Sequence, residues 1–135
     1  MSYPITDIGG VDGDVAATLK SVGIRSTGRL LEVARTVKGR KSLAEKTGFD
    51  EKQLLCWANV ADRMRIRGIS KEYAELLQAA GVDTVKELKY RNPANLASAM
   101  ADANTKRKMV RLLPSEKVVG RWIENAKKLP LKITY

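Results

Sequence analysis

The residues best suited to hold an anion surround a glycine in the middle of the chain. Gly68, Ser70 and Lys71 can present backbone N–H, hydroxyl and ammonium groups to one phosphate. Arg63 and Arg67 flank this turn and can reach neighbouring phosphates. The alternative interpretation is that these cations are solvated side chains on helix surfaces, as most Lys and Arg are.

A second group of cations lies near residues 103–113, which we call the basic segment. Its members are Lys106, Arg107, Lys108 and Arg111. The segment either extends a track of phosphate contacts or forms a well-solvated loop. Sequence alone does not place it beside the turn at Gly68.

Charge is unevenly distributed along the chain. The 135 residues include 25 Lys and Arg against 15 Asp and Glu, a net charge of +10. Residues 1–34 carry three cations and four acids, a net of −1, so the remaining residues carry +11. The first cations after this acidic part are Arg35, Lys38, Arg40 and Lys41. This balance favours an acidic partner such as nucleic acid or an anionic surface.

Several kinds of catalytic and metal site are excluded by composition. The chain has no His and one Cys, which rules out His-dependent triads, His metal sites and an intramolecular disulfide. Cys56 lies in an apolar stretch, so we expect it to be a small buried residue. The acids are scattered, which predicts a protein that is not an enzyme and that holds no cofactor or metal. The remaining enzymatic alternative, a lysine-based lyase, needs an ammonium group with a perturbed pKa.

The sequence predicts an imperfect repeat within one domain, residues 1–135. A shift of 58 residues aligns Gly23 with Gly81 and Leu30 with Leu88, among other apolar and glycine positions. The predicted repeat units are 5–65 and 66–130, and the second is longer because it contains the basic segment.

Helix signals are dense and strand signals are nearly absent, which predicts an all-α fold. A helix is expected from Asp50 to about Arg67, with a buried face and with Arg63 and Arg67 pointing away from that face. Further helices are expected after Ser70, after Thr84, after Asn92, and from about 114–116 to 128, with Gly81 ending one of them. The expected buried face of the first helix is Leu54, Trp57, Ala61 and Met64, and that of the last is Val118, Val119, Trp122, Ile123 and Ala126.

Aromatic residues are few, at 5% of the chain. Trp57, Tyr73 and Trp122 fall on apolar helix faces, so we expect them in the core. Proteins that bind single strands usually stack bases on exposed aromatic rings. Contact with a duplex backbone is therefore favoured over stacking with single strands.

The segment 66–84 resembles a helix-hairpin-helix motif, in which a glycine turn and an apolar residue precede a helix start. Nearly the whole chain is similar to the bacterial helix-hairpin-helix family known as domain of unknown function 4332. The strings that carry this resemblance include Gly39-Arg40-Lys41-Ser42-Leu43-Ala44, Trp57-Ala58-Asn59-Val60-Ala61-Asp62-Arg63-Met64-Arg65-Ile66, Arg91-Asn92-Pro93 and Trp122-Ile123-Glu124-Asn125-Ala126-Lys127-Lys128-Leu129. The resemblance implies a tandem of related helical halves in one compact domain, and hairpins that hold DNA phosphates without reading bases.

The first hairpin, 8–16, has the same skeleton but a different charge. In the strongest phosphate-binding hairpins a second glycine follows the apolar residue, whereas Asp12 and Ser70 stand there in this chain. Ser70 can cap the helix and donate to phosphate. Asp12 and Asp14 put negative charge where a phosphate would lie, so we expect the first hairpin to be structural.

These observations predict a non-catalytic module that contacts duplex DNA phosphates without sequence specificity. The alternative is a protein-interaction or scaffold module with no role in nucleic-acid binding. A cytoplasmic location is expected, because the sequence has neither an apolar run of membrane-spanning length nor a signal-peptide pattern at its start. The choice between DNA and RNA, and the oligomeric state, stay open.

Overall fold

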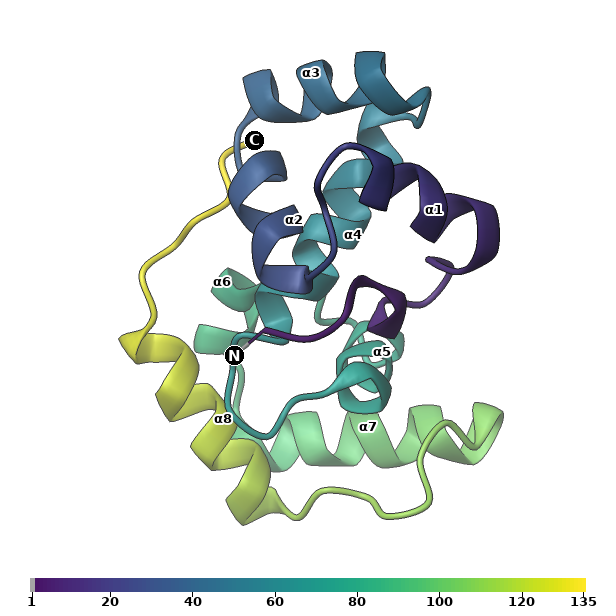
Figure 1. Cartoon of the computed structure of the whole chain (residues 1–135). Coiled ribbons are helices and arrows are strands. Elements are labelled where there is room, and N and C mark those ends of the chain that lie inside the picture. The colour runs from purple at the N-terminus through teal and green to yellow at the C-terminus, as the bar shows by residue number, and fades with distance from the viewer. Residues whose placement is uncertain (1) are drawn as a thin grey trace. The chain divides into compact units, whose positions relative to one another are not determined.

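The chain folds into helices. The computed structural model describes residues 2–135, and in that range it contains eight α-helices, one 3-10 helix and no β-strand (Figure 1). An isolated bridge pairs Pro4 with Ser26. The all-α prediction is confirmed.

The helices divide into two compact units. Unit 1 contains the described residues up to Arg65 together with Lys132–Tyr135, and unit 2 contains Ile66–Leu131. Each unit holds four of the eight α-helices. The interpretations of the chain as one domain and of 5–65 and 66–130 as repeats stay predictions.

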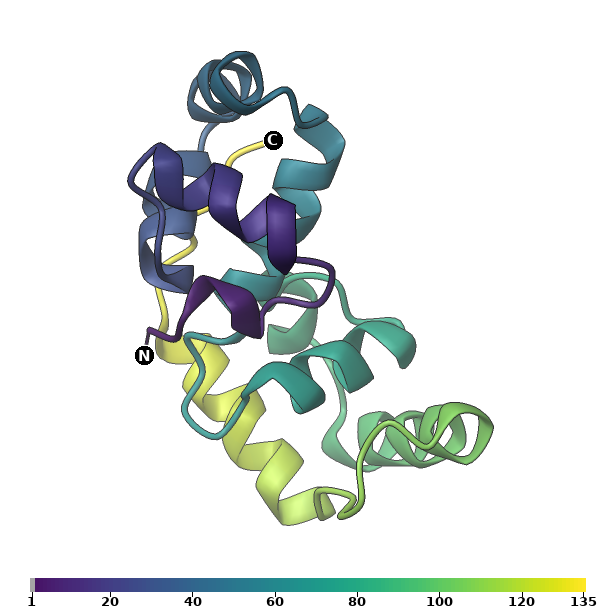
Figure 2. The ribbon, with the colours of Figure 1, turned by 45° about the vertical axis from the view of Figure 1, so that its right-hand side comes forward.

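Unit 1 is built around a pair of contacting helices, α2 and α4. Figures 1 and 2 show α3 lying across one end of this pair, and α3 contacts both helices. The helical elements of unit 1 are η1 (Ile5–Asp7), α1 (Gly13–Ser21), α2 (Thr27–Ala34), α3 (Val37–Thr47) and α4 (Glu51–Arg63).

Short polar side chains set the helix starts in unit 1. Ser26, Thr36 and Asp50 each accept a hydrogen bond from a backbone N–H in the first turn of α2, α3 and α4 respectively. Gly48, at φ 80°, ends α3 in the left-handed conformation that glycine adopts without strain. The predicted Asp50 cap is confirmed.

Helix α4 ends earlier than its sequence pattern predicts. Its last residue is Arg63, because the following backbone tightens and the Arg65 N–H donates to the Asp62 carbonyl three residues back. The expected apolar face is confirmed, with Leu54 and Trp57 among its buried members. Cys56, however, lies exposed, so the prediction that it is buried is wrong. Cys56 lies on the side of α4 opposite the core. The run of apolar residues around it does not show which side of the helix faces the core.

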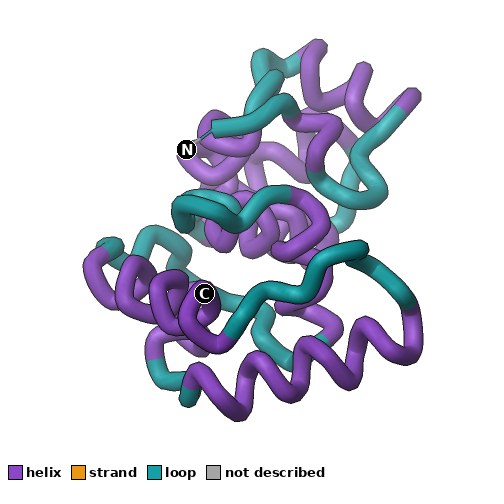
Figure 3. Tube along the Cα trace, turned by 90° about the horizontal axis from the view of Figure 1, so that it is seen from below, coloured by secondary structure: helices purple, strands orange, loops and turns teal. Residues whose placement is uncertain are grey.

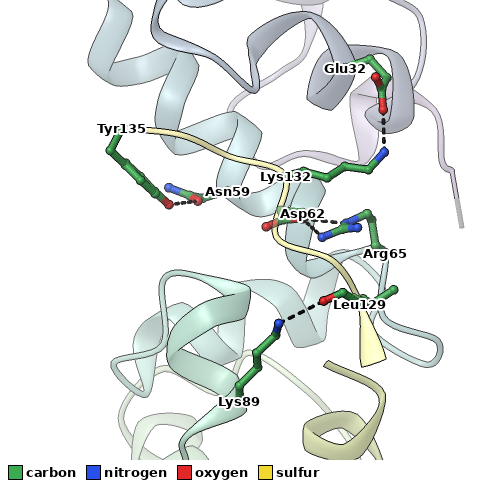
Figure 4. Close-up of polar contacts among 8 residues, drawn as sticks. All are labelled: Glu32, Asn59, Asp62, Arg65, Lys89, Leu129, Lys132 and Tyr135. Carbon is green, nitrogen blue, oxygen red and sulfur yellow. Dashed lines mark hydrogen bonds and ion pairs between the residues drawn. The ribbon is translucent and has the colours of Figure 1, made fainter. Parts of the chain in front are cut away.

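The segment Lys132–Tyr135 lies against unit 1 although unit 2 precedes it in the chain. The Lys132 ammonium lies 2.6 Å from a Glu32 carboxylate oxygen, and the Tyr135 hydroxyl donates to Asn59 Oδ1 at 3.0 Å (Figure 4). The backbone N–H of Thr134 donates to the Arg35 carbonyl at 2.8 Å. Three of these four residues therefore make polar contacts with unit 1.

Arg40 is the buried centre of this attachment, with 4% of the residue exposed. One guanidinium nitrogen donates to the Ala34 carbonyl at 2.9 Å, near the end of α2, and the other to the Thr134 carbonyl at 2.6 Å. Burial lowers the pKa of the Arg40 guanidinium. Arg40 therefore serves the fold of unit 1, although its sequence neighbours Lys38 and Lys41 are exposed.

Replacing Arg40 with Met should lower the free energy of unfolding by about 2–3 kcal/mol, because charged hydrogen bonds to two carbonyl groups are lost. Chemical denaturation measures this change. Lys41→Met is the matched control: it removes the same charge from an exposed position of α3, and we expect a change within about 0.5 kcal/mol. Equal effects of the two substitutions would contradict the role assigned to Arg40.

Unit 2 contains α5 (Lys71–Ala79), α6 (Val85–Lys89), α7 (Pro93–Arg107) and α8 (Glu116–Lys128). Helix α8 contacts α6 and α7, and α5 contacts α7. Figure 3 shows a loop that leaves the end of α7 and runs back to the start of α8. The Lys89 ammonium donates to the Leu129 carbonyl at 3.0 Å and so joins the end of α8 to α6 (Figure 4).

The helix boundaries of unit 2 follow the predicted capping residues closely. Thr84, Asn92 and Ser115 accept hydrogen bonds from first-turn N–H groups of α6, α7 and α8. Gly81 takes the left-handed conformation at φ 95° just beyond α5. The predicted core face of α8 is confirmed at four of its five positions, while Val118 is half-buried.

Candidate nucleic-acid interface

The second hairpin, Ile66–Lys71, turns its backbone outward over two buried side chains. Ile66 and Ile69 are 1% and 0% exposed, and the Ile69 N–H donates to the Ile66 carbonyl at 3.0 Å. Gly68, between them, is exposed and has φ 94°. The apolar pair anchors the turn, so the exposed backbone around Gly68 is held in place.

Three of the predicted phosphate ligands around this turn are exposed side chains: Arg67, Ser70 and Lys71. Ser70 is the N-cap residue of α5, but its hydroxyl makes no capping hydrogen bond, unlike Ser115 at the start of α8. The prediction that the Ser70 side chain caps α5 is therefore wrong. The hydroxyl instead lies at the surface beside the first turn of α5, where backbone N–H groups point out of a helix and attract anions.

Arg63 does not join this group. Only 1% of the residue is exposed, because α4 is buried on nearly every side between Trp57 and Met64. The prediction that Arg63 points away from the buried face and reaches a phosphate is wrong on this ground. An arginine inside a helix that is buried all round gives the same sequence pattern as an arginine on a helix surface.

The basic segment is part helix and part loop. Lys106 and Arg107 form the last turn of α7, whereas Lys108 ends that helix in the left-handed conformation, at φ 49°. All four of its cations are exposed. Each of them can therefore face an anion.

An asparagine fixes the start of the loop. The Asn104 side-chain amide donates to the Val110 carbonyl at 3.1 Å, and its oxygen accepts from the Val110 N–H at 2.9 Å. This two-way pair closes the turn at the end of α7 and holds the backbone between Lys108 and Arg111. The loop is therefore joined to the last turns of its own helix by two hydrogen bonds.

The basic segment also lies beside the helix that carries the second hairpin. The Tyr73 hydroxyl, from the first turn of α5, donates to the Leu112 carbonyl at 2.9 Å. The Tyr73 ring lies 5.3 Å from the Trp122 ring of α8, and a Cβ added to Gly68 would lie 3.0 Å from Trp122 Nε1. Hairpin, loop and α8 therefore meet around two aromatic rings.

Of these rings, Trp122 is buried as predicted, as is Trp57 in unit 1. Tyr73 is only half-buried, so its assignment to the core is wrong in part: the ring packs inward while the hydroxyl reaches the loop. No sequence signal pairs Tyr73 with a residue 39 positions away.

The first hairpin has the same local geometry with opposite charge. Ile8 and Val11 are each 1% exposed, the Val11 N–H donates to the Ile8 carbonyl at 3.0 Å, and Gly10 has φ 85°. Asp12 and Asp14 follow this turn and are exposed. Carboxylates beside a helix start repel an anion, so the two hairpins differ in what they can bind.

Two carboxyl groups of unit 1 outside these hairpins have shifted pKa values. Burial raises the pKa of the Asp62 carboxyl, against the opposing effect of the Arg65 guanidinium 2.6 Å away. The hydrogen bond from Lys132 lowers the pKa of the exposed Glu32 carboxyl. Residues 2–135 contain no group of three or more acidic or cysteine side chains placed to hold a metal ion. Over the same range no helix is both long and apolar enough to cross a membrane.

Comparison with known proteins gives one match. The model of a family described as a domain of unknown function (DUF4332) matches residues 9–129. No curated protein and no solved structure matches the chain. Because the match covers both units almost completely, the chain belongs to the DUF4332 family.

Proposed function

We propose that unit 2 is a helix-hairpin-helix module that binds duplex DNA through phosphates and without sequence specificity. The observation that carries this proposal is the hydrogen bond between Tyr73 and Leu112, which joins the basic segment to the first turn of α5. Two parts of unit 2 that are distant in the sequence thereby meet, and each carries exposed cations. These cations are Arg67, Lys71, Lys106, Arg107, Lys108 and Arg111.

Phosphate contacts position a protein on nucleic acid but carry no base identity. The exposed groups around the second hairpin are ammonium, guanidinium, hydroxyl and backbone N–H groups, all of which suit phosphate oxygens. Both indole rings, Trp57 and Trp122, are buried, so neither can stack on a base of a single strand. The proposed role is binding without catalysis, in a bacterial cytoplasm where duplex DNA is accessible.

The double substitution Ser70→Glu with Lys71→Glu tests the hairpin. Two carboxylates at the first turn of α5 should lower duplex affinity by about tenfold or more, because they remove one phosphate contact and repel the strand. A mobility-shift titration at several salt concentrations measures the change. Ser98→Glu with Lys86→Glu is the matched control, because it changes the charge of unit 2 equally at exposed positions outside the hairpin and the basic segment.

Two results would refute this proposal. One is the absence of duplex binding by the unaltered protein even at low salt. The other is an equal loss of affinity from the hairpin substitutions and from the control substitutions. That result would mean that binding depends on the overall positive charge and not on the hairpin.

A protein-interaction or scaffold role is the second candidate. The exposed pair Asp12 and Asp14 at the first hairpin favours it, because two carboxylates beside a turn suit a basic protein better than DNA. Purification from the native cell discriminates the two functions. A stoichiometric protein partner that survives nuclease and high salt would support the scaffold role.

A further inference from the structure

The basic segment ends in two exposed leucines. Leu112 is 76% exposed and Leu113 is 40% exposed, and Arg111 directly precedes them. An exposed Leu by itself needs no explanation, but two adjacent ones beside several cations form a small apolar surface that a partner can contact. The cations next to the pair indicate that its partner is anionic.

The backbone beneath Leu112 is held from both sides. On one side, the Asn104 side chain is paired with Val110. On the other, Ser115 caps α8, and the Tyr73 hydroxyl binds the Leu112 carbonyl itself. The Leu112 side chain therefore projects from a backbone that is held in place by hydrogen bonds. A side chain held in this way suits insertion between two rigid surfaces.

We propose that Leu112 is a wedge that enters the minor groove and inserts between two base pairs of the bound duplex. This inference rests on the proposed function. Tyr73, which holds Leu112, and Lys71, at the second hairpin, both lie in the first turn of α5, so the loop and the second hairpin are close together in unit 2. Proteins that bend DNA insert apolar side chains in this way and hold the flanking phosphates with cations.

The narrowness of the apolar surface favours a base step over a lipid bilayer. Peripheral membrane binding uses a broad apolar helix face, together with basic residues that face anionic lipid. Here the apolar surface at the loop is two adjacent side chains on a fixed backbone. Leu112, the more exposed of the two, is a side chain of the kind that DNA-bending proteins insert between base pairs.

Two fluorescence measurements with the whole chain test this wedge. A duplex of about 20–30 base pairs carries 2-aminopurine, which brightens when its base is unstacked, or donor and acceptor dyes at its ends, which report bending. The unaltered protein should raise the 2-aminopurine signal and bend the duplex by an angle in the range of about 20–90°. Leu112→Ala should remove most of both signals while keeping the salt dependence of binding, because the phosphate contacts stay. Leu131→Ala, at a residue 55% exposed in unit 2 outside the loop, should keep both signals.

The outcomes separate the wedge from the proposed function. Binding with neither unstacking nor bending, or equal signals from Leu112→Ala and the unaltered protein, would overturn the wedge and leave phosphate binding standing. Failure of the unaltered protein to bind duplex would overturn both. Binding to phosphatidylserine vesicles that Leu112→Ala abolishes, without duplex unstacking, would assign the loop to a membrane and overturn the wedge.

Discussion

Changing the four cations of the basic segment to glutamine should produce the largest loss of duplex affinity. The substitutions are Lys106→Gln, Arg107→Gln, Lys108→Gln and Arg111→Gln, all at exposed positions. Each phosphate contact adds about 0.9 to the slope of log affinity against log salt, so the slope should fall by about 2–4. Affinity at low salt should fall by about 100-fold or more. Fluorescence anisotropy at a series of salt concentrations measures both quantities.

A second set of four exposed cations provides the control. Arg35→Gln, Lys38→Gln, Lys41→Gln and Lys46→Gln remove the same charge from α3 and its N-terminal flank in unit 1. Because the proposed contact lies in unit 2, this set should change the salt slope by less than about 1. Similar losses from the two sets would mean that binding follows net charge alone and would contradict a localised interface.

Substituting Gly68 should have the largest effect on the stability of unit 2. A side chain at φ 94° takes a conformation that costs about 1–2 kcal/mol in L-residues. The added Cβ would also lie 3.0 Å from Trp122 Nε1, a buried ring that packs against Tyr73. We expect Gly68→Ala to lower the free energy of unfolding by about 2–4 kcal/mol. Denaturant titration followed by tryptophan fluorescence measures this change.

Gly81 separates the two causes. It has almost the same backbone conformation, at φ 95°, but an added Cβ would meet no heavy atom within 4 Å. Gly81→Ala should therefore cost only the conformational part, about 1–2 kcal/mol. If Gly68→Ala lowers the free energy of unfolding by no more than Gly81→Ala does, the close approach of the second hairpin to Trp122 does not contribute to stability.

Local chemistry made much of the fold predictable. Caps at Asp50, Thr84 and Ser115 involve residues three or fewer positions apart, so the sequence alone contains both partners. The apolar spacing on α4 and α8 likewise predicts their buried faces. The end of α4 was less predictable, because the tightening after Arg63 depends on packing as well as on local preference.

The direction of long side chains was the main source of error. Arg40 and Arg63 look like their exposed neighbours in sequence, yet both are buried. A guanidinium becomes part of an interior when carbonyl groups elsewhere in the fold meet its N–H groups, as Ala34 and Thr134 meet Arg40. Thr134 lies 94 residues from Arg40, so periodicity cannot reveal this partner.

The candidate site was predictable in its parts but not in its assembly. Glycine, serine and cations around Gly68 indicated one half, and the composition of residues 103–113 indicated the other. Their association depends on Tyr73, which spacing assigned to the core, and on the Asn104 pair with Val110, which has no characteristic sequence pattern. Tertiary hydrogen bonds of single residues decide where a loop lies.

The attachment of Lys132–Tyr135 to unit 1 has a consequence for the order of folding during synthesis. The ribosome releases residues up to Arg65 first, but the Thr134 carbonyl that Arg40 binds follows 94 residues after Arg40. Until then Glu32 also lacks its ion pair with Lys132. Nascent unit 1 therefore lacks these contacts while unit 2 is made, and its final stability develops only after residues 132–135 have been synthesised.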